Sequence, residues 1–157
     1  LSRRQRQMCI RDRFYIGGAN SVRAFNVRSI GPGRYHPSDA KLSYIEQTGD
    51  LKILGNLEYR PQLWGSLYGA IFLDAGNVWS LRDSSNRPGS KFEARNLFSQ
   101  MAVGTGVGLR YDVGIFVLRV DWGIGLHVPY DTGKSGFYNV SSFADAQSLH
   151  LAVGYPF

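Results

Sequence analysis

Residues 51–60, LKILGNLEYR, decide the fold class, because apolar and polar side chains alternate along them. Successive side chains of a β-strand point to opposite faces, so this alternation predicts a strand with one apolar and one polar face. The apolar face would carry Leu51, Ile53, Leu57 and Tyr59, and the polar face Lys52, Asn56, Glu58 and Arg60. Such a strand belongs to a sheet whose two faces meet different surroundings.

The same period returns four times downstream. It predicts strands at about residues 50–60, 66–79, 98–111, 115–128 and 146–157. The connections between them are alternately short and long, which is typical of outer-membrane barrels, whereas a soluble sandwich follows no such odd-even rule. The predicted fold is therefore all-β, an antiparallel meander of about five transmembrane strands. Five strands cannot close a membrane barrel, whose smallest bacterial forms have about eight.

Composition alone leaves a soluble domain open. The chain has 157 residues, of which 43% are hydrophobic, and its mean hydropathy is −0.21. The apolar stretches are far shorter than the ~20 residues of a spanning helix, but a barrel strand needs only about 9–11 alternating residues. Aromatic residues cluster at the predicted strand ends, as interface girdles would: Tyr59, Trp64, Trp79, Tyr111, Tyr130, Tyr155 and Phe157.

The first thirteen residues, LSRRQRQMCIRDR, share neither the period nor the composition of the rest. They contain five arginines, one aspartate and the single cysteine, Cys9, and so contribute four of the six net positive charges. We interpret residues 1–13 as a foreign or disordered segment and residues 14–157 as the barrel portion. Without the segment the chain is only slightly basic, so its charge does not indicate binding of nucleic acid.

A predicted loop at residues 17–49 precedes the first strand and begins with GGANSVRAF, residues 17–25. Its glycines and asparagine tolerate positive φ and do not propagate a strand. Arg23 lies between the apolar residues Val22 and Phe25. An arginine shielded from water needs carboxylate partners to offset its desolvation, so we expect acidic partners downstream.

The run FYIGGANSVRAFNVRSIGPGRY, residues 14–35, resembles the corresponding loop of the BamA/TamA family, outer-membrane barrels that insert or translocate other outer-membrane proteins. FLDAGNVW, residues 72–79, and the closing GYPF, residues 154–157, extend the resemblance. The family pattern is valine-arginine-glycine-phenylalanine or tyrosine, and here the motif is Val22, Arg23, Ala24 and Phe25, with alanine where glycine is expected. The resemblance implies the final third of a sixteen-stranded barrel in the outer membrane of a Gram-negative bacterium, with periplasmic POTRA repeats upstream.

The resemblance also implies the partners of Arg23. In the family the loop arginine reaches acids inside the barrel, and the matching positions here are Glu58 and Asp74. Both acids fall on the inward faces of neighbouring predicted strands. The alternative is that a polar lumen simply hydrates them.

The last strand carries two roles in the family, the edge of a lateral seam and the C-terminal targeting signal. The residues concerned are Leu151, Val153, Gly154, Tyr155 and Phe157. A glycine near the end of the strand weakens its pairing, which would make the seam easier to open.

No motif indicates catalysis. His36, His127 and His150 lie in different elements without the spacing of a metal site, and we interpret them as loop or lumen histidines. The glycine-rich run at residues 104–108 lies inside a predicted strand and lacks the lysine of a phosphate-binding loop. Its glycines either leave room for something packed against the sheet or let the sheet curve. We therefore expect no enzyme activity, no metal and no cofactor.

The sequence favours an outer-membrane protein assembly, insertion or translocation factor that acts without catalysis through a lateral seam. Its expected partners are membrane lipid, unfolded outer-membrane proteins and accessory assembly proteins. One alternative is a secretion pore of the same superfamily, either a two-partner transporter or the barrel of a patatin-like lipase. The other is a passive porin or a soluble lipocalin-like binder, although neither would explain the arginine loop and its acids.

Overall fold

The computed structural model describes residues 13–37, 47–81, 88–140, 142, 144 and 146–154. The interpretation of the N-terminal segment, apart from Arg13, and the roles predicted for Tyr155 and Phe157 lie outside these residues. The predicted loop is described up to residue 37 and again from residue 47.

The described residues form one antiparallel sheet in which each long strand pairs with the next along the chain, as in a meander. The long strands are β1 (Leu51–Tyr59), β3 (Leu67–Trp79), β4 (Ala102–Asp112), β5 (Val117–His127) and β6 (Gln147–Gly154). Within the described part of the chain the sheet is not closed, since the strand order runs from β1 to β6. The predicted all-β antiparallel fold is confirmed.

The structure differs from the prediction at two places, before β3 and before β4. A three-residue strand, β2 (Gln62–Trp64), lies where the sequence predicts only a turn, because Gln62 pairs with Tyr68 and lengthens the hairpin. The strand predicted to start at residue 98 starts at Ala102 instead. Two 3₁₀ turns, η2 (Ala94–Asn96) and η3 (Phe98–Gln100), precede it.

Gln100 explains why β4 starts late. Its side chain is buried and its Oε1 accepts a hydrogen bond of 2.6 Å from Trp79 Nε1, while its backbone carbonyl accepts one from Asn77 Nδ2. The backbone N–H groups of Gln100 and Met101 donate to the carbonyls of Leu97 and Phe98, so neither is free to pair in the ladder. The predicted strand therefore starts earlier than β4 does, because these contacts keep the residues before Ala102 out of the ladder.

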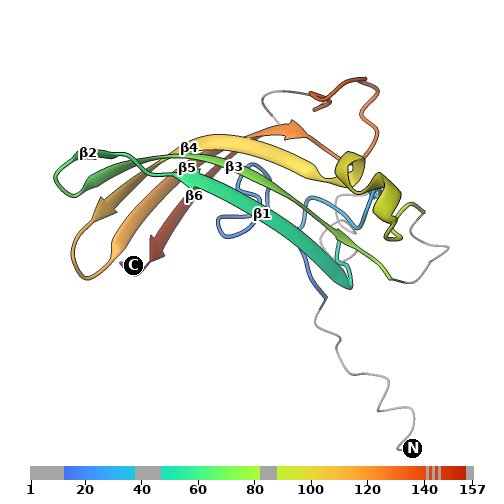
Figure 1. The fold of residues 1–157 in the computed structure, drawn as a ribbon, viewed down its shortest axis with the longest axis horizontal. Coiled ribbons are helices and arrows are strands. Elements are labelled where there is room, and N and C mark those ends of the chain that lie inside the picture. The colour runs from blue at the N-terminus through green and yellow to red at the C-terminus, as the bar shows by residue number, and fades with distance from the viewer. Residues whose placement is uncertain are drawn as a thin grey trace, which may run out of the picture.

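The connections lie at opposite ends of the sheet according to their length. The β1–β3 connection through β2 and the β4–β5 turn at residues 113–116 lie at one end, and the β3–β4 and β5–β6 connections, with η2 and η3, lie at the other (Figure 1). The described end of the chain, Gly154, lies at the end with the short turns. This is the alternation predicted from the sequence.

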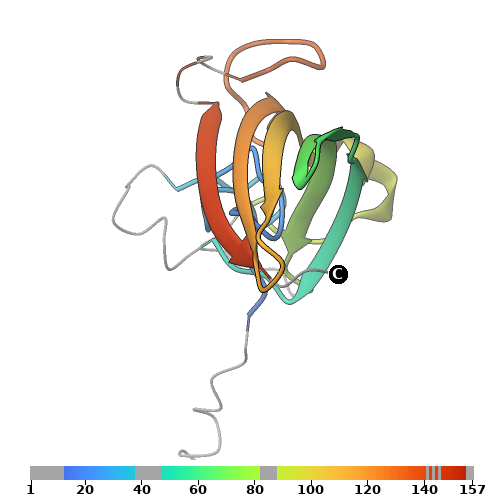
Figure 2. The ribbon, with the colours of Figure 1, turned by 90° about the vertical axis from the view of Figure 1, so that its left-hand side faces the viewer.

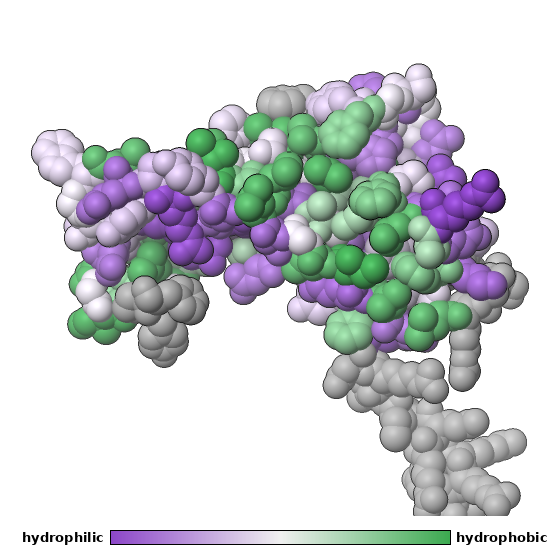
Figure 3. Space-filling model, viewed as in Figure 1, coloured by the Kyte–Doolittle hydropathy of each residue, from purple (hydrophilic) through white to green (hydrophobic). Residues whose placement is uncertain are grey.

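The two faces of the sheet differ as the strand period predicts. Large apolar side chains that the alternation places on the outward face are exposed, two of them by more than half: Leu57, Leu73, Leu109, Leu118, Trp122 and Leu151. Apolar side chains gather over the middle of the side of the molecule shown in Figure 3. On the inward face, by contrast, Phe72, Asp74 and Asp121 are fully buried. No helix in the described part of the chain is long and apolar enough to cross a membrane.

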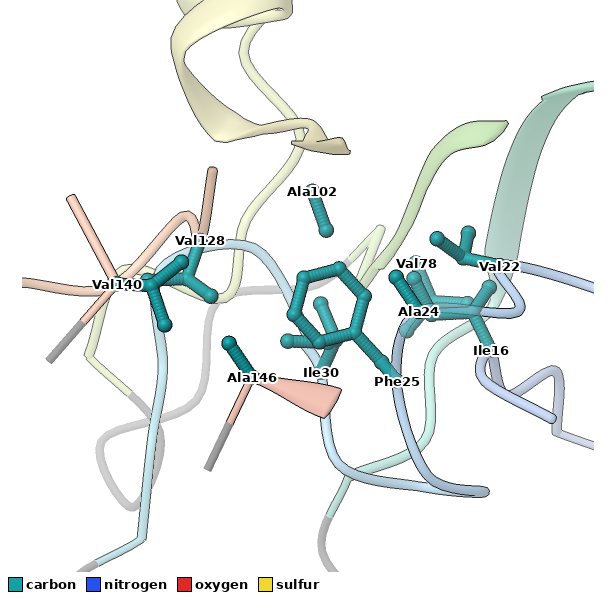
Figure 4. Packing of buried hydrophobic residues seen from close by; sticks show 10 residues of the cluster. All are labelled: Ile16, Val22, Ala24, Phe25, Ile30, Val78, Ala102, Val128, Val140 and Ala146. Carbon is teal, nitrogen blue, oxygen red and sulfur yellow. The ribbon is translucent and has the colours of Figure 1, made fainter. Parts of the chain in front are cut away.

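The core lies inside the curve of the sheet, between the sheet and the N-terminal loop (Figure 2). Its buried apolar residues come from the loop, from the strand ends near the long connections and from the β5–β6 connection (Figure 4): Ile16, Val22, Ala24, Phe25, Ile30, Val78, Ala102, Val128, Val140 and Ala146. The loop therefore fills the space that a second sheet would fill in a sandwich.

If the outward face meets lipid, an arginine there should be costly in the middle of a strand and tolerated near its rim. We predict that Leu73→Arg lowers the unfolding free energy of the full-length protein in lipid vesicles by roughly 2–4 kcal/mol, and that Ile115→Arg, in the β4–β5 turn, lowers it by about 0–1 kcal/mol. Urea titration followed by tryptophan fluorescence measures both. Equal losses at the two depths would contradict a membrane-facing surface.

Candidate functional site

The loop that carries Arg23 is a closed structure. Gly18 N–H donates to the carbonyl of Phe25 at 2.8 Å, and Arg28 N–H donates to the carbonyl of Ile16 at 2.9 Å. These two hydrogen bonds join the incoming and outgoing segments of the loop at its base. Gly17 has a φ of 98°, and a Cβ there would overlap the backbone of Asn26. Only glycine fits this turn, which presents the tip of the loop to the inner face of the sheet.

Asp74 of β3 binds the loop arginine in two ways. The guanidinium of Arg23 donates from Nε to Oδ2 and from Nη2 to Oδ1, each at 2.8 Å, and the backbone N–H of Arg23 donates to Oδ2 at 3.0 Å. Asn56 of β1, which lies opposite Asp74 in the ladder, donates to Oδ1 at 2.7 Å. The carboxylate has no exposed surface, so these four hydrogen bonds replace the water that it has lost.

Glu58 of β1 is the second acid partner. Its Oε2 accepts from Arg23 Nη1, and its Oε1 accepts from Arg60 Nε at 2.7 Å and from Arg110 Nη2 at 3.1 Å. The guanidinium carbon of Arg23 also lies 3.7 Å from the ring centroid of Phe72, a cation–π contact. The contact predicted between Arg23 and the two acids is thus observed, with both acids engaged. We call Arg23, Glu58 and Asp74 the arginine clamp.

The ion pairs continue from the clamp across β4 and β5. Arg110 joins Glu58 to Asp121, and Arg119 Nη2 donates to Asp121 at 3.1 Å. The sequence places Asn56 on the polar face of its predicted strand, but neither Asn56 nor Arg110 is predicted to join the site. The only indication in the sequence is that each of these two residues falls on the inward face of its strand. Their partners depend on cross-strand register, which a single strand does not reveal.

The alanine at position 24 fits without strain. Among the described residues other than glycine, only Arg28 has a positive φ, so position 24 does not need the backbone freedom of glycine. The Ala24 methyl group occupies the place where a Cβ on Gly104 would lie. The departure from the family motif is therefore accommodated by a glycine of β4.

The glycines on the inward faces of β4 and β5 make room for the loop. A Cβ on Gly123 would lie 2.5 Å from the carbonyl oxygen of Arg23, and one on Gly125 would lie 2.9 Å from the ring of Phe25. Of the two explanations left open for the glycines at residues 104–108, close packing against the loop applies at Gly104. The loop backbone can approach the sheet only because these side chains are absent.

The last described strand contacts the site from its inward face. Ser148 Oγ and His150 Nε2 both lie within hydrogen-bond distance of the carbonyl oxygen of Arg23, at 2.5 and 2.9 Å. His150, interpreted above as a lumen histidine without special chemistry, therefore contacts the loop. Leu151 and Val153 point outward and the structure does not bring them to the clamp, so the seam and signal roles of this strand remain predictions.

The described residues contain no group of three or more histidine, cysteine, aspartate or glutamate side chains that could hold a metal ion. The polar groups of the clamp are instead bonded to one another. The arrangement is suited to holding a loop in place.

Comparison with known protein families identifies a matching profile. The profile of the Omp85 superfamily domain matches residues 3–142. The chain belongs to the Omp85 superfamily. This is a superfamily of membrane β-barrels, and the match reaches into the basic segment that composition sets apart.

Curated relatives of this Omp85 chain include the sorting and assembly machinery component 50 homologs of animals. The mouse protein is 37% identical and the human protein 35% identical over 109 residues, which cover 64% of this chain. The Xenopus laevis homolog A is 33% identical over 111 residues, or 67% of this chain. In each case the match covers 22% of the relative, so the chain spans about a fifth of the length of these relatives.

Removing the arginine of the clamp should leave Asp74 buried with a single side-chain donor. We predict that Arg23→Ala lowers the unfolding free energy of the full-length protein by roughly 3–5 kcal/mol, the usual effect of breaking a buried pair. Arg23→Lys should recover only part of the loss, because an ammonium group cannot form the two-pronged contact. Urea unfolding in detergent micelles measures both, and an alanine variant as stable as the parent would show that the clamp does not hold the loop.

The close approach of the loop to β5 gives a separate test. We predict that Gly123→Ala destabilises the protein by roughly 1–3 kcal/mol, because its methyl group would meet backbone atoms of Arg23 and Ala24. Gly55→Ala is the matched control, since the nearest atom to its Cβ would be 4.0 Å away. The same unfolding measurement should find Gly55→Ala as stable as the parent or more so. Equal destabilisation of the two variants would contradict the packing described here.

Proposed function

We propose that this chain is part of a transmembrane β-barrel that inserts or assembles other β-barrel proteins in the outer membrane of a Gram-negative bacterium. The observation that carries the proposal is the contrast between the two faces of one sheet. The outward face exposes large apolar side chains, whereas the inward face holds a buried network of ion pairs around a folded-in loop. A soluble protein rarely leaves such an apolar face uncovered.

The family and the names of the relatives support the assembly branch of the proposal. The matched animal proteins are named as components of a sorting and assembly machinery. Since this chain spans about a fifth of their length, the activity, the clients and the accessory partners of the whole protein are all part of what we propose. The proposed clients are unfolded outer-membrane proteins and the proposed surroundings are membrane lipid.

The proposed mechanism needs no catalytic residue. A client strand would pair with an open edge of the sheet, and the client's own burial of apolar surface in lipid would drive its insertion. The clamp would keep the loop against the inner wall and so preserve the curvature of the sheet while its edge is open. In this proposal Arg23 works by holding structure.

The proposal predicts a measurable acceleration of client folding. Vesicles that contain the full-length protein should fold a urea-unfolded outer-membrane barrel faster than empty vesicles, as followed by the gel shift of the folded client. Arg23→Ala, assayed at a temperature where it stays folded, should slow this step by about tenfold, the factor that corresponds to roughly 1.4 kcal/mol.

Leu109→Val, a small change on the outward face, serves as the control and should fold the client as fast as the parent. A parent protein that folds clients no faster than empty vesicles would overturn the proposal. Ion conductance without such acceleration would favour a pore instead.

A further inference from the structure

Arg23 forms hydrogen bonds both through its amide and guanidinium groups and through its carbonyl. The two sets of bonds reach different parts of the sheet. Its amide and guanidinium donate to Asp74 and Glu58, on β3 and β1. Its carbonyl accepts from Ser148 and His150, on β6. Since β4 and β5 lie between β3 and β6, these two strands are about 14 Å apart along the curved sheet at the usual strand spacing of about 4.8 Å. A single residue therefore joins two separated parts of the curved wall.

The geometry on β6 is suited to this contact. Ser148 and His150 are two residues apart and so share the inward face, opposite Gly123 and Asp121 of β5. Because Gly123 has no side chain, the Arg23 carbonyl can lie over β5 and reach both donors. A carbonyl oxygen has two lone pairs and only accepts, so the histidine carries a proton on Nε2. Ser148 is buried in this contact.

The strand β6 is the last strand of the described sheet. Among the described strands it pairs only with β5, and its outward side chains, Leu149, Leu151 and Val153, are 66–75% exposed. Gln147 Oε1 accepts a bond from Trp122 of the same neighbour, β5. The contact with Arg23 thus attaches β6 to a part of the protein other than its neighbouring strand.

We propose that Ser148 and His150 are positioning residues that latch β6 to the backbone of the arginine loop. When the latch is closed, β6 can leave the sheet only if the loop moves with it or both hydrogen bonds break. The inference deepens the proposed function, because a seam that opens at β6 would require the latch to release. The hydrogen bonds of the loop would then depend on the position of this strand.

Hydrogen–deuterium exchange of the full-length protein in lipid vesicles, read by mass spectrometry, tests the latch. In Ser148→Ala/His150→Ala the amides of β6 should exchange faster by about tenfold or more, as two lost hydrogen bonds imply, while those of β3 change by less than about twofold. His150→Gln keeps an N–H donor and should restore part of the protection relative to His150→Ala. If the double variant does not fold, the single variants Ser148→Ala and His150→Ala should each show about a threefold effect.

His127→Ala is the matched control. It removes a histidine from β5 whose ring contacts the carbonyls of Ser99 and Phe137 but not Arg23, so exchange of β6 should match that of the parent. Unchanged exchange of β6 in the Ser148 and His150 variants would overturn the latch. Equal acceleration in β3 and β6 would also overturn it, since it would indicate general loss of stability.

The exchange measurement does not depend on the proposed function. A protein that fails to fold clients but shows the selective exchange in β6 would disprove the proposed function and leave the latch standing. A protein that folds clients but shows no selective exchange would do the reverse.

Discussion

A carboxylate without any exposed surface, on the inner wall of an open sheet, is the constraint on which the rest of this structure depends. Asp74 would be costly to bury alone, by several kcal/mol. The loop and β1 satisfy it together, with the amide and guanidinium of Arg23 and the side chain of Asn56. The inner wall and the loop therefore stabilise each other. Loss of the loop would leave Asp74 with an incomplete set of hydrogen-bond donors. Loss of Asp74 would leave Arg23 buried with Glu58 as its one acidic partner among the described residues.

The electrostatic requirement is met only because a steric one is met too. An arginine that reaches Asp74 brings its own backbone and that of Ala24 against β4 and β5, where side chains of ordinary size would keep the loop away. Glycines at 104, 123 and 125 remove that obstacle. The loop then buries the apolar residues on either side of Arg23, so that one short segment supplies both the counter-charge and much of the core.

The same strands serve two surroundings. Their inward residues pack on the loop or join the ion pairs that run from Asp74 through Glu58 and Arg110 to Asp121. Their outward residues are large, apolar and exposed. In an Omp85 protein this division lets the sheet keep its internal polar contacts while its outer surface meets lipid. A change in the conformation of the loop would also alter contacts with β1, β3 and β6 together, because Arg23 contacts all three strands.

The sequence by itself determined the five long strands, their two faces and the alternation of short and long connections, because side-chain alternation and turn residues are local properties. Together with the family resemblance, it also identified Arg23, Glu58 and Asp74 as partners. Tertiary structure alone decided the rest. β4 starts at Ala102 because Gln100 is engaged by Asn77 and Trp79 of another strand. Asn56 and Arg110 join the site through cross-strand register, and Ser148 and His150 join it because the loop lies across Gly123. These contacts link residues up to 127 positions apart, and only the folded chain brings them together, since a sequence pattern records which face a residue occupies but not what lies against it.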